Sequence, residues 1–203
     1  MPYPDRFYPV VDSVAWVARL TKLGVGTIQL RAKNLDDAAA LTIVKEALAV
    51  TKGTSTKLVV NDYWRAAIDA GAQHLHLGQE DLDTADVQAI RRAGLTLGLS
   101  THDEDELDNA LAYKPDYIAL GPIYETTLKK MRFAPQGIER ITAWKLLIGD
   151  IPLVAIGGIK LEQADMIFAA GANSIAVVSD VTQNTDPDAR VKAWLNATME
   201  VVR

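Results

Sequence analysis

The sequence predicts an α/β protein with the (β/α)8 TIM-barrel fold, in one domain that spans residues 1–203. Three observations support this prediction. Short runs rich in Val, Ile and Leu alternate with amphipathic stretches along the whole chain, there are eight such runs, and no linker or low-complexity segment divides them. Strict alternation indicates a parallel sheet whose strands are covered on both faces. Eight units favour a closed barrel over the alternative, an open doubly wound sheet.

The predicted strands are short apolar runs of the kind that parallel sheets bury. In chain order they are residues 7–11, 25–30, 57–60, 74–77, 95–99, 117–120, 153–156 and 174–178. The predicted helices place apolar residues three or four positions apart, so that one face is apolar. They are residues 13–23, 36–51, 62–70, 84–93, 101–112, 138–148, 161–170 and 187–202.

Two local signals mark helix ends. Gly24, Gly71, Gly94 and Gly171 each follow a helical stretch and precede a strand by one to three residues. Glycine suits this position because it accepts a positive φ without a Cβ clash. The segment 101–104, which starts with Thr and ends with Glu, predicts a capping box at a helix start.

Composition excludes several classes of protein. Hydrophobic residues make up 49% of the 203 residues and charged residues 23%, as in ordinary soluble proteins. The absence of cysteine rules out disulfides, thiolate metal sites and a cysteine nucleophile, and is consistent with a cytoplasmic location. A net charge of −5 argues against nucleic acid as a partner. Neither a signal peptide nor an apolar stretch near the roughly 18 residues of a membrane span is expected.

Polar residues and glycines follow at least six of the predicted strands. Barrel active sites lie at the C-terminal ends of the strands, so these residues are expected to share one rim. In strand order they include Gln29, Arg31 and Lys33, then Asn61 and Asp62, then Asp81, Ser100 and His102, the loop 121–130, Gly157 and Gly158, and Ser179.

The rim is suited to phosphate and to a divalent cation. Arg31 and Lys33 alternate with Gln29 and so project to one side, where both cations suit phosphate oxygens; the alternative is a solvated strand end. Asp62 and Asp81 follow neighbouring strands, and two converging carboxylates suit Mg²⁺ that also binds substrate phosphates. Separately, Asp62 could be a helix N-cap and Asp81 a loop acid.

Three further segments are candidates for anion binding or catalysis. Lys129 lies in a long polar loop with Lys130 and Arg132, and one lysine is expected to bind a phosphate, although charge alone does not separate the first two. The glycine pair 157–158 and the segment 178–179 follow the last two strands, a frequent phosphate site in barrels. For the histidines at positions 74 and 76, packing is the favoured interpretation, and His102 is favoured as a first-turn helix residue over a catalyst.

Together these segments resemble one enzyme family. The set QLRAK (29–33), ND (61–62), HLGQED (76–81), STH (100–102), GPIY…K…APQG (121–137), AIGGI (155–159) and VVS (177–179) is similar to thiamine phosphate synthase. The resemblance covers nearly the whole chain, in order. It implies a transferase of thiamine biosynthesis that joins 4-amino-2-methyl-5-pyrimidinylmethyl diphosphate to 4-methyl-5-(2-phosphooxyethyl)thiazole, or to its carboxylated precursor, and releases diphosphate with Mg²⁺ as cofactor.

The resemblance also implies roles for individual residues. Gln29, Arg31, Lys33, Asn61 and Lys129 would bind the pyrimidine diphosphate, Ser100 would lie beside it, and Asp62 and Asp81 would hold Mg²⁺. Thr126, Thr127, Leu128, Gly158, Val178 and Ser179 would hold the thiazole phosphate. Within these sets, Lys129, Arg31, Lys33 and Ser100 are the expected catalytic residues. The expected partners are thus small phosphorylated molecules, without nucleic acid or membrane, and the sequence makes no prediction of oligomeric state.

One loop departs from the family pattern, which usually reads Pro-Thr-x-Thr-Lys. Here Glu125 replaces the proline and Leu128 replaces the second threonine, so a hydroxyl contact to the thiazole phosphate is missing. Three alternatives follow: a thiazole tautomerase that uses His102 as its acid–base residue, a non-catalytic sensor of thiamine-related phosphates, and an unrelated phosphate-binding barrel isomerase. The joint presence of Arg31, Lys33 and the two aspartates favours the synthase.

Overall fold

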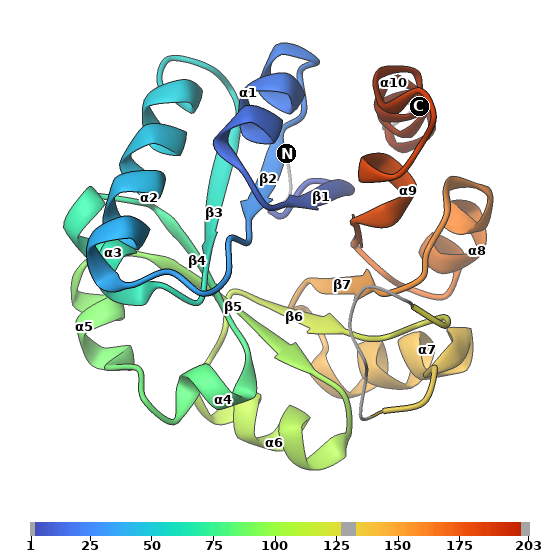
Figure 1. Cartoon of the computed structure of the whole chain (residues 1–203). Helices are drawn as coiled ribbons and strands as arrows, with labels where there is room; N and C mark the ends of the chain where they lie inside the picture. The colour runs from blue at the N-terminus through green and yellow to red at the C-terminus, as the bar shows by residue number, and fades with distance from the viewer. Residues whose placement is uncertain (1–2, 127–132, 200–203) are drawn as a thin grey trace.

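A computed structural model, which describes residues 3–126 and 133–199, has eight parallel strands closed into a barrel (Figure 1). Each strand pairs with the next in the chain, and β1 pairs with β8 through Phe7 and Ile175 to close the ring. The strands are β1 (Phe7–Val11), β2 (Thr27–Leu30), β3 (Lys57–Asn61), β4 (His74–Leu77), β5 (Thr96–Thr101), β6 (Tyr117–Leu120), β7 (Leu153–Ile156) and β8 (Ser174–Val177).

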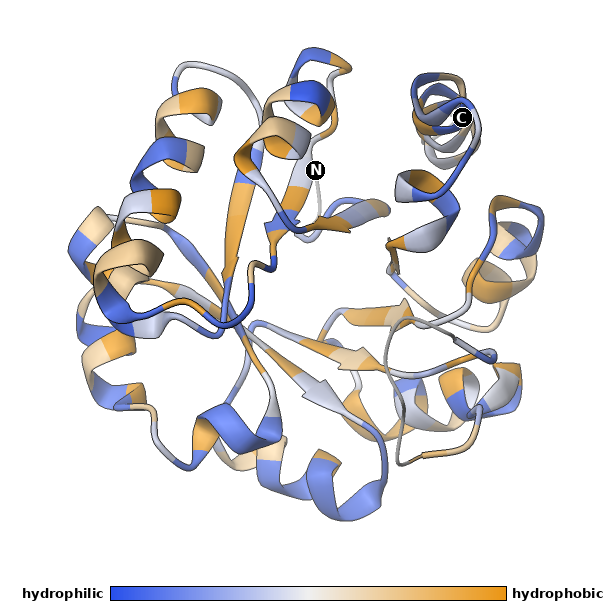
Figure 2. Cartoon of the chain, in the orientation of Figure 1, coloured by the Kyte–Doolittle hydropathy of each residue, from blue (hydrophilic) through white to orange (hydrophobic). Residues whose placement is uncertain are grey.

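Helices surround the strands (Figure 1). In order they are α1 (Val14–Lys22), α2 (Asp37–Thr51), α3 (Trp64–Ala70), α4 (Gln79–Leu82), α5 (Val87–Arg92), α6 (Glu104–Ala112), α7 (Gly137–Ile148), a 3-10 turn η1 (Leu161–Gln163), α8 (Ala164–Ala169), α9 (Ser179–Thr182) and α10 (Pro187–Thr198). Their surfaces alternate between apolar and polar patches, as expected of amphipathic helices around a barrel (Figure 2). None of the helices in the described ranges is long and apolar enough to cross a membrane.

The buried residues form two layers. The larger layer lies between the strands and the surrounding helices and includes the fully buried Trp144 and Trp194. The smaller layer fills the barrel interior with side chains from alternate strand positions, which point inward because successive residues of a strand face opposite sides. It consists of Tyr8, Val10, Val59, Tyr117, Ala119, Val154 and Ala176. The inward positions nearest the C-terminal ends are polar, and they form the site described below.

The predicted barrel is confirmed, including the position of every strand to within two residues at either end. The four helix-ending glycines all have positive φ, between +72° and +110°. The capping box predicted at 101–104 is wrong. Thr101 ends β5, and α6 instead begins after Asp103, whose carboxylate accepts the N–H of Glu106 at 2.9 Å. Thr101 is held in the core, where its hydroxyl donates to the carbonyl of Ala119.

Two one-turn helices at the rim were not predicted. Helix α4 lies in the loop after β4 and carries Asp81, and α9 begins directly after β8 with Ser179. Four residues are too few to show a helical period in a sequence. Both short helices place candidate site residues at the C-terminal end of the barrel.

Candidate active site

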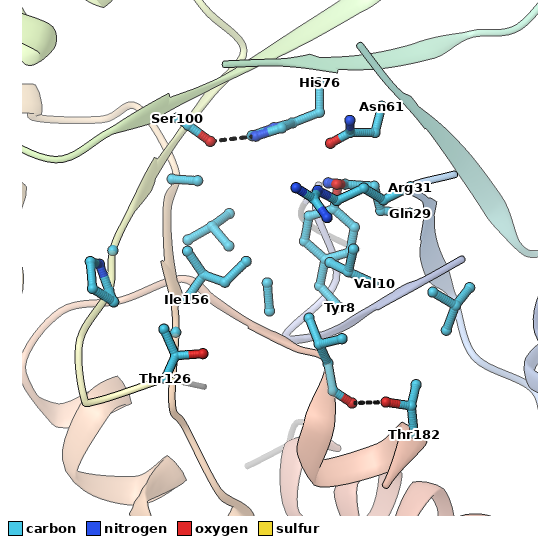
Figure 3. Close-up of a pocket in the computed structure, with 18 of the residues that line it drawn as sticks. Tyr8, Val10, Gln29, Arg31, Asn61, His76, Ser100, Thr126, Ile156 and Thr182 are labelled. Carbon is cyan, nitrogen blue, oxygen red and sulfur yellow. Dashed lines mark hydrogen bonds between the residues drawn. The ribbon is translucent and has the colours of Figure 1, made fainter. Parts of the chain in front are cut away.

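A cavity of about 430 Å³ opens at the C-terminal end of the barrel (Figure 3). Its size suits a small-molecule ligand. The walls combine apolar side chains of the inner layer with polar side chains from the strand ends. Lining residues include Tyr8, Gln29, Arg31, Asn61, His76, Ser100, His102, Thr126, Gly157, Val178 and Gln183.

The sequence prediction located much of this cavity. Gln29, Arg31, Asn61, Ser100, Thr126 and Val178 all line it. Figure 3 shows Gln29, Arg31 and Asn61 on one wall and Ser100 across from them. The side-chain amide nitrogen of Asn61 is buried and has no hydrogen-bond partner among the described residues. A buried donor without a partner is costly, so an acceptor on a ligand in this cavity would stabilise it.

Beside the cavity, Lys33 and the two predicted metal ligands form a charged cluster. The ammonium group of Lys33 contacts the carboxylate of Asp62. Burial raises the pKa of Asp81, and the negative charge of Asp62 raises it further. The two carboxylates therefore interact, as the sequence predicted, although each comes from a different strand–helix loop.

The conformation of Asp62 directs this arrangement. Its φ is +64°, in the left-handed region that only a few residue types tolerate. Its N–H donates to the carbonyl of His76 on the neighbouring strand at 2.9 Å. The N-cap of α3 is Tyr63, so the alternative role of Asp62 as a helix cap is wrong. Asp81 is likewise more than a loop acid, because it belongs to α4 and accepts the N–H of Gly78 at 3.2 Å.

A continuous chain of five hydrogen-bonded side chains runs across the floor of the cavity. The amide of Gln29 donates to the hydroxyl of Tyr8 at 2.8 Å, and this hydroxyl is 2.9 Å from that of Tyr117. The Tyr117 hydroxyl is 2.9 Å from Nδ1 of His76, whose Nε2 is 2.8 Å from the hydroxyl of Ser100. The sequence assigned His76 to packing, whereas the structure makes it a cavity residue that orients its neighbours.

The groups in this chain are uncharged at neutral pH. Burial lowers the pKa of His76 to about 4, and the nearby positive charges of Arg31 and Lys33 add to this effect against the carboxylate of Asp62. Burial raises the pKa of both Tyr8 and Tyr117. The floor of the cavity is therefore a neutral hydrogen-bonding surface beneath a charged rim.

The buried neutral His76 predicts a specific pH dependence of stability. Its pKa is about 4 in the folded chain and 6.5 when exposed, so the unfolded state binds more protons between these values. The free energy of unfolding should therefore fall as the pH drops, with His76 contributing about 2 kcal/mol of the loss from about pH 7 to about pH 5. Urea unfolding at both pH values measures it.

The matched control for this pH prediction is His76→Asn, which cannot be protonated in this range. The loss of stability between the two pH values should be smaller in this variant by the share that His76 contributes. An equal loss in the two proteins would show that His76 is not buried as a neutral group.

The glycine pair after β7 has a structural role as well as a predicted functional one. A Cβ on Gly157 would lie 2.6 Å from Cα of Pro122, and one on Gly158 would lie 2.3 Å from the carbonyl oxygen of Glu125. Both glycines also have positive φ. They thus allow the loop after β6 to pack against the end of β7, with Gly157 lining the cavity. Gly158 and Ser179 are each adjacent in sequence to a lining residue.

A salt-bridge cluster holds α9 beside this part of the cavity. Arg190 of α10 binds the carboxylate of Asp180 and also that of Glu162, with N–O distances of 2.7 to 2.9 Å. The indole N–H of Trp194 donates to Asp180 at 2.7 Å. Arg190 therefore offsets the negative charge of Asp180, which lies one residue after the predicted phosphate-binding Ser179.

His102 lines the cavity but is not part of a helix turn, contrary to the expectation. Its Nδ1 is 2.6 Å from the carboxylate of Glu106, and its ring stacks on Phe133 at 4.7 Å. Phe133 follows the segment that holds Thr127, Leu128 and Lys129, three predicted site residues that lie outside the described part of the chain, as do Lys130 and Arg132.

Sequence reasoning missed Tyr8 and Tyr117, which lie inside predicted strands and look like ordinary core residues. The available signal was Gly98, a glycine within a strand, which marks a close approach by another group. A Cβ at this position would lie 1.9 Å from Cζ of Tyr117, its partner on the adjacent strand.

Comparison with known proteins agrees with the geometry. Residues 7–181 match the family described as thiamine monophosphate synthase. A thiamine-phosphate synthase of Rhizobium etli is 53% identical over 96% of this chain and 95% of its own length. One from Cronobacter sakazakii is 50% identical over 99% of this chain and 93% of its own.

A solved structure of a thiamine phosphate pyrophosphorylase from Pyrococcus furiosus superimposes with a TM-score of 0.83 and 25% identity, covering 98% of this chain and 97% of that one. A 3-hexulose-6-phosphate synthase at 16% identity and a TM-score of 0.71 shares the fold. The family match spans most of the chain, and the two relatives match it at about half of all positions. The chain therefore belongs to the thiamine monophosphate synthase family of transferases.

Proposed function

We propose that residues 1–203 act as one catalytic domain that condenses 4-amino-2-methyl-5-pyrimidinylmethyl diphosphate with 4-methyl-5-(2-phosphooxyethyl)thiazole in the cytoplasm. The products are thiamine phosphate and diphosphate. The family match supports the reaction. The observation that carries the proposal is the charged cluster of Lys33, Asp62 and Asp81 beside a cavity lined by Arg31.

The pyrimidine diphosphate is assigned to the side of the cavity formed by β2, β3 and β5. Arg31 and Lys33, joined by Lys129, are proposed to bind the diphosphate oxygens, because guanidinium and ammonium groups form strong charge-assisted hydrogen bonds with them. Gln29, Asn61 and Ser100 offer neutral polar groups to the aminopyrimidine. The unpartnered amide of Asn61 supports this assignment.

The thiazole phosphate is assigned to the opposite side, at the ends of β7 and β8. Thr126 and Val178 line the cavity there, next to Gly157. Gly158 and Ser179 are proposed to offer backbone N–H groups to the phosphate, together with Thr127 and the backbone of Leu128. This would compensate for the hydroxyl that Leu128 lacks.

The two carboxylates fit Mg²⁺. Asp62 and Asp81 interact closely enough for the charge of the first to raise the pKa of the second, so a cation between them would relieve the repulsion. No group of three or more acidic, His or Cys ligands occurs among the described residues. Mg²⁺ needs no such group, because it keeps waters and takes phosphate oxygens from the substrate. When bound, it would neutralise charge on the diphosphate.

The residues of the cavity suit a dissociative displacement. The bond between the pyrimidine CH2 carbon and the diphosphate oxygen breaks, and its electron pair leaves with the diphosphate. The electron-rich aminopyrimidine shares the resulting positive charge. The lone pair of the thiazole nitrogen then forms the new C–N bond, which leaves a thiazolium cation. Arg31, Lys33 and Lys129 stabilise the departing anion, and no protein nucleophile is needed.

The direct test is to mix the purified protein with both substrates and Mg²⁺ and to measure released diphosphate. Release that requires both substrates and the metal is expected. Substituting the carboxylated thiazole phosphate shows which form is preferred. Isomerisation of the thiazole without diphosphate release would indicate a tautomerase that uses His102. Tight binding of both substrates without turnover would indicate a sensor.

Lys129→Ala is expected to slow turnover at saturating substrate far more than Lys130→Ala, by about 100-fold or more, because loss of a charge aimed at a leaving group costs this much. The two variants lose the same charge at neighbouring positions, so each is the control for the other. Steady-state kinetics measures both. The reverse order would mean that Lys130 is the residue that binds the diphosphate.

A further inference from the structure

The Ser100 side chain is held from two directions. Its backbone carbonyl accepts the side-chain amide of Gln79 at 2.7 Å, and Gln79 is itself held by Asn109 at 2.8 Å. Its hydroxyl is 2.8 Å from Nε2 of His76. Ser100 also lines the cavity (Figure 3). The remaining freedom is whether its hydroxyl proton points to His76 or into the cavity.

Counting donors along the buried chain decides this question. Gln29 donates to the Tyr8 oxygen, so the Tyr8 proton has the Tyr117 oxygen as its partner. Tyr117 then donates its own proton to Nδ1 of His76. A neutral imidazole carries one proton, which must therefore be on Nε2 and donates to the Ser100 oxygen. The Ser100 proton is left for the cavity.

The opposite direction leaves a buried proton without an acceptor in the chain. If Ser100 donated to His76, then Nδ1 would donate to Tyr117 and Tyr117 to Tyr8. The Tyr8 oxygen would accept from both Gln29 and Tyr117, and its proton would have no partner within this chain at a site that is 1% exposed. An unpaired buried hydroxyl is unfavourable, so the first direction is preferred.

We propose that Tyr117, through the Nε2–H tautomer of His76, holds Ser100 as a hydrogen-bond donor to the ligand. Tyr117 and His76 are thus positioning residues for Ser100. The ligand atom facing Ser100 must carry a lone pair. On the proposed function it is either a ring nitrogen of the aminopyrimidine or an oxygen of the diphosphate.

The tautomer can be measured on the protein without any substrate, so this test is independent of the proposed reaction. The chain contains only three histidines, and His74→Asn and His102→Gln variants assign their signals. Long-range ¹H–¹⁵N NMR at neutral pH is expected to show the His76 proton on Nε2 and an unprotonated Nδ1. A proton on Nδ1, or a doubly protonated ring, would overturn the proposal.

Two matched variants test the role of Tyr117. Tyr117→Phe and Tyr8→Phe each remove one buried hydroxyl from the chain, but only the first contacts His76. We expect Tyr117→Phe to shift His76 to a mixture of tautomers and Tyr8→Phe to keep the Nε2–H form. The wild-type spectrum decides the direction even if one variant fails to fold. Identical tautomers in both variants would remove Tyr117 from its positioning role.

A functional measurement identifies the acceptor. Ser100→Ala should weaken inhibition by whichever probe carries the facing atom, about fivefold for one hydrogen bond. The probes are inorganic diphosphate with Mg²⁺ and 4-amino-5-hydroxymethyl-2-methylpyrimidine. Tyr117→Phe should weaken the same probe, with a larger effect on KM than on kcat. Unchanged inhibition by both probes in Ser100→Ala would contradict donation to the ligand.

Discussion

Asp81→Asn is expected to reduce Mg²⁺-dependent turnover by about 100-fold or more, because it removes one of two carboxylates that hold the cation near the leaving diphosphate. Asparagine keeps an oxygen that can accept the N–H of Gly78, so the start of α4 should be preserved. The repulsion from Asp62 is also removed. Without Mg²⁺, the free energy of unfolding should therefore be unchanged or higher. Steady-state kinetics and urea unfolding measure the two effects.

Asp83→Asn is the matched control, because it makes the same chemical change two residues away at an exposed position. Its turnover and Mg²⁺ dependence should equal those of the wild type. Equal rates for wild type and Asp81→Asn at limiting Mg²⁺ would contradict the metal assignment. Equal losses in both variants would mean that the loop, and not the carboxylate at 81, is responsible.

Gly98→Ala is expected to destabilise the fold by about 3 kcal/mol or more, because the added Cβ would overlap the ring of Tyr117. The Cβ would lie 1.9 Å from Cζ and 2.3 Å from Cε1 of that ring. Moving the ring breaks its hydrogen bonds to Tyr8 and His76, each 2.9 Å long. Chemical denaturation measures the loss of stability.

Two comparisons separate this clash from a general cost of losing glycine. Gly24→Ala changes a glycine with φ of +83° and no atom within 4 Å of the new Cβ, so it should cost only about 1 kcal/mol. In a Tyr117→Leu background, Gly98→Ala should cost much less than in the wild type, because the ring is gone. An equal cost in both backgrounds would show that Tyr117 is not the group that Gly98 accommodates.

Much of the fold could be predicted because its signals are local. The eight apolar runs and the glycines after four helices each depend on a few neighbouring residues, and the structure agrees with them. The barrel topology then places the strand ends on one rim without further information. For this reason Arg31, Asn61 and Ser100, which are far apart in the chain, could be predicted to share one cavity.

The hydrogen-bonded floor of the cavity could not be predicted in the same way. Tyr8 and Tyr117 come from β1 and β6, and their contact depends on which residues the register turns inward at the same height. Similarly, Thr101 looked like a helix cap because its spacing to Glu104 fits one, but the buried contacts with Ala119 and Trp144 place it in the strand. Tertiary packing determined both outcomes.

The central claim is that the charged cluster beside the cavity binds a diphosphate through a divalent cation. Isothermal titration of the pyrimidine diphosphate into wild type and Asp81→Asn, each with and without Mg²⁺, tests it most directly. The account predicts that Mg²⁺ tightens binding to the wild type by at least about tenfold and has little effect on the variant. Equal tightening by Mg²⁺ in both proteins, or none in the wild type, would contradict it.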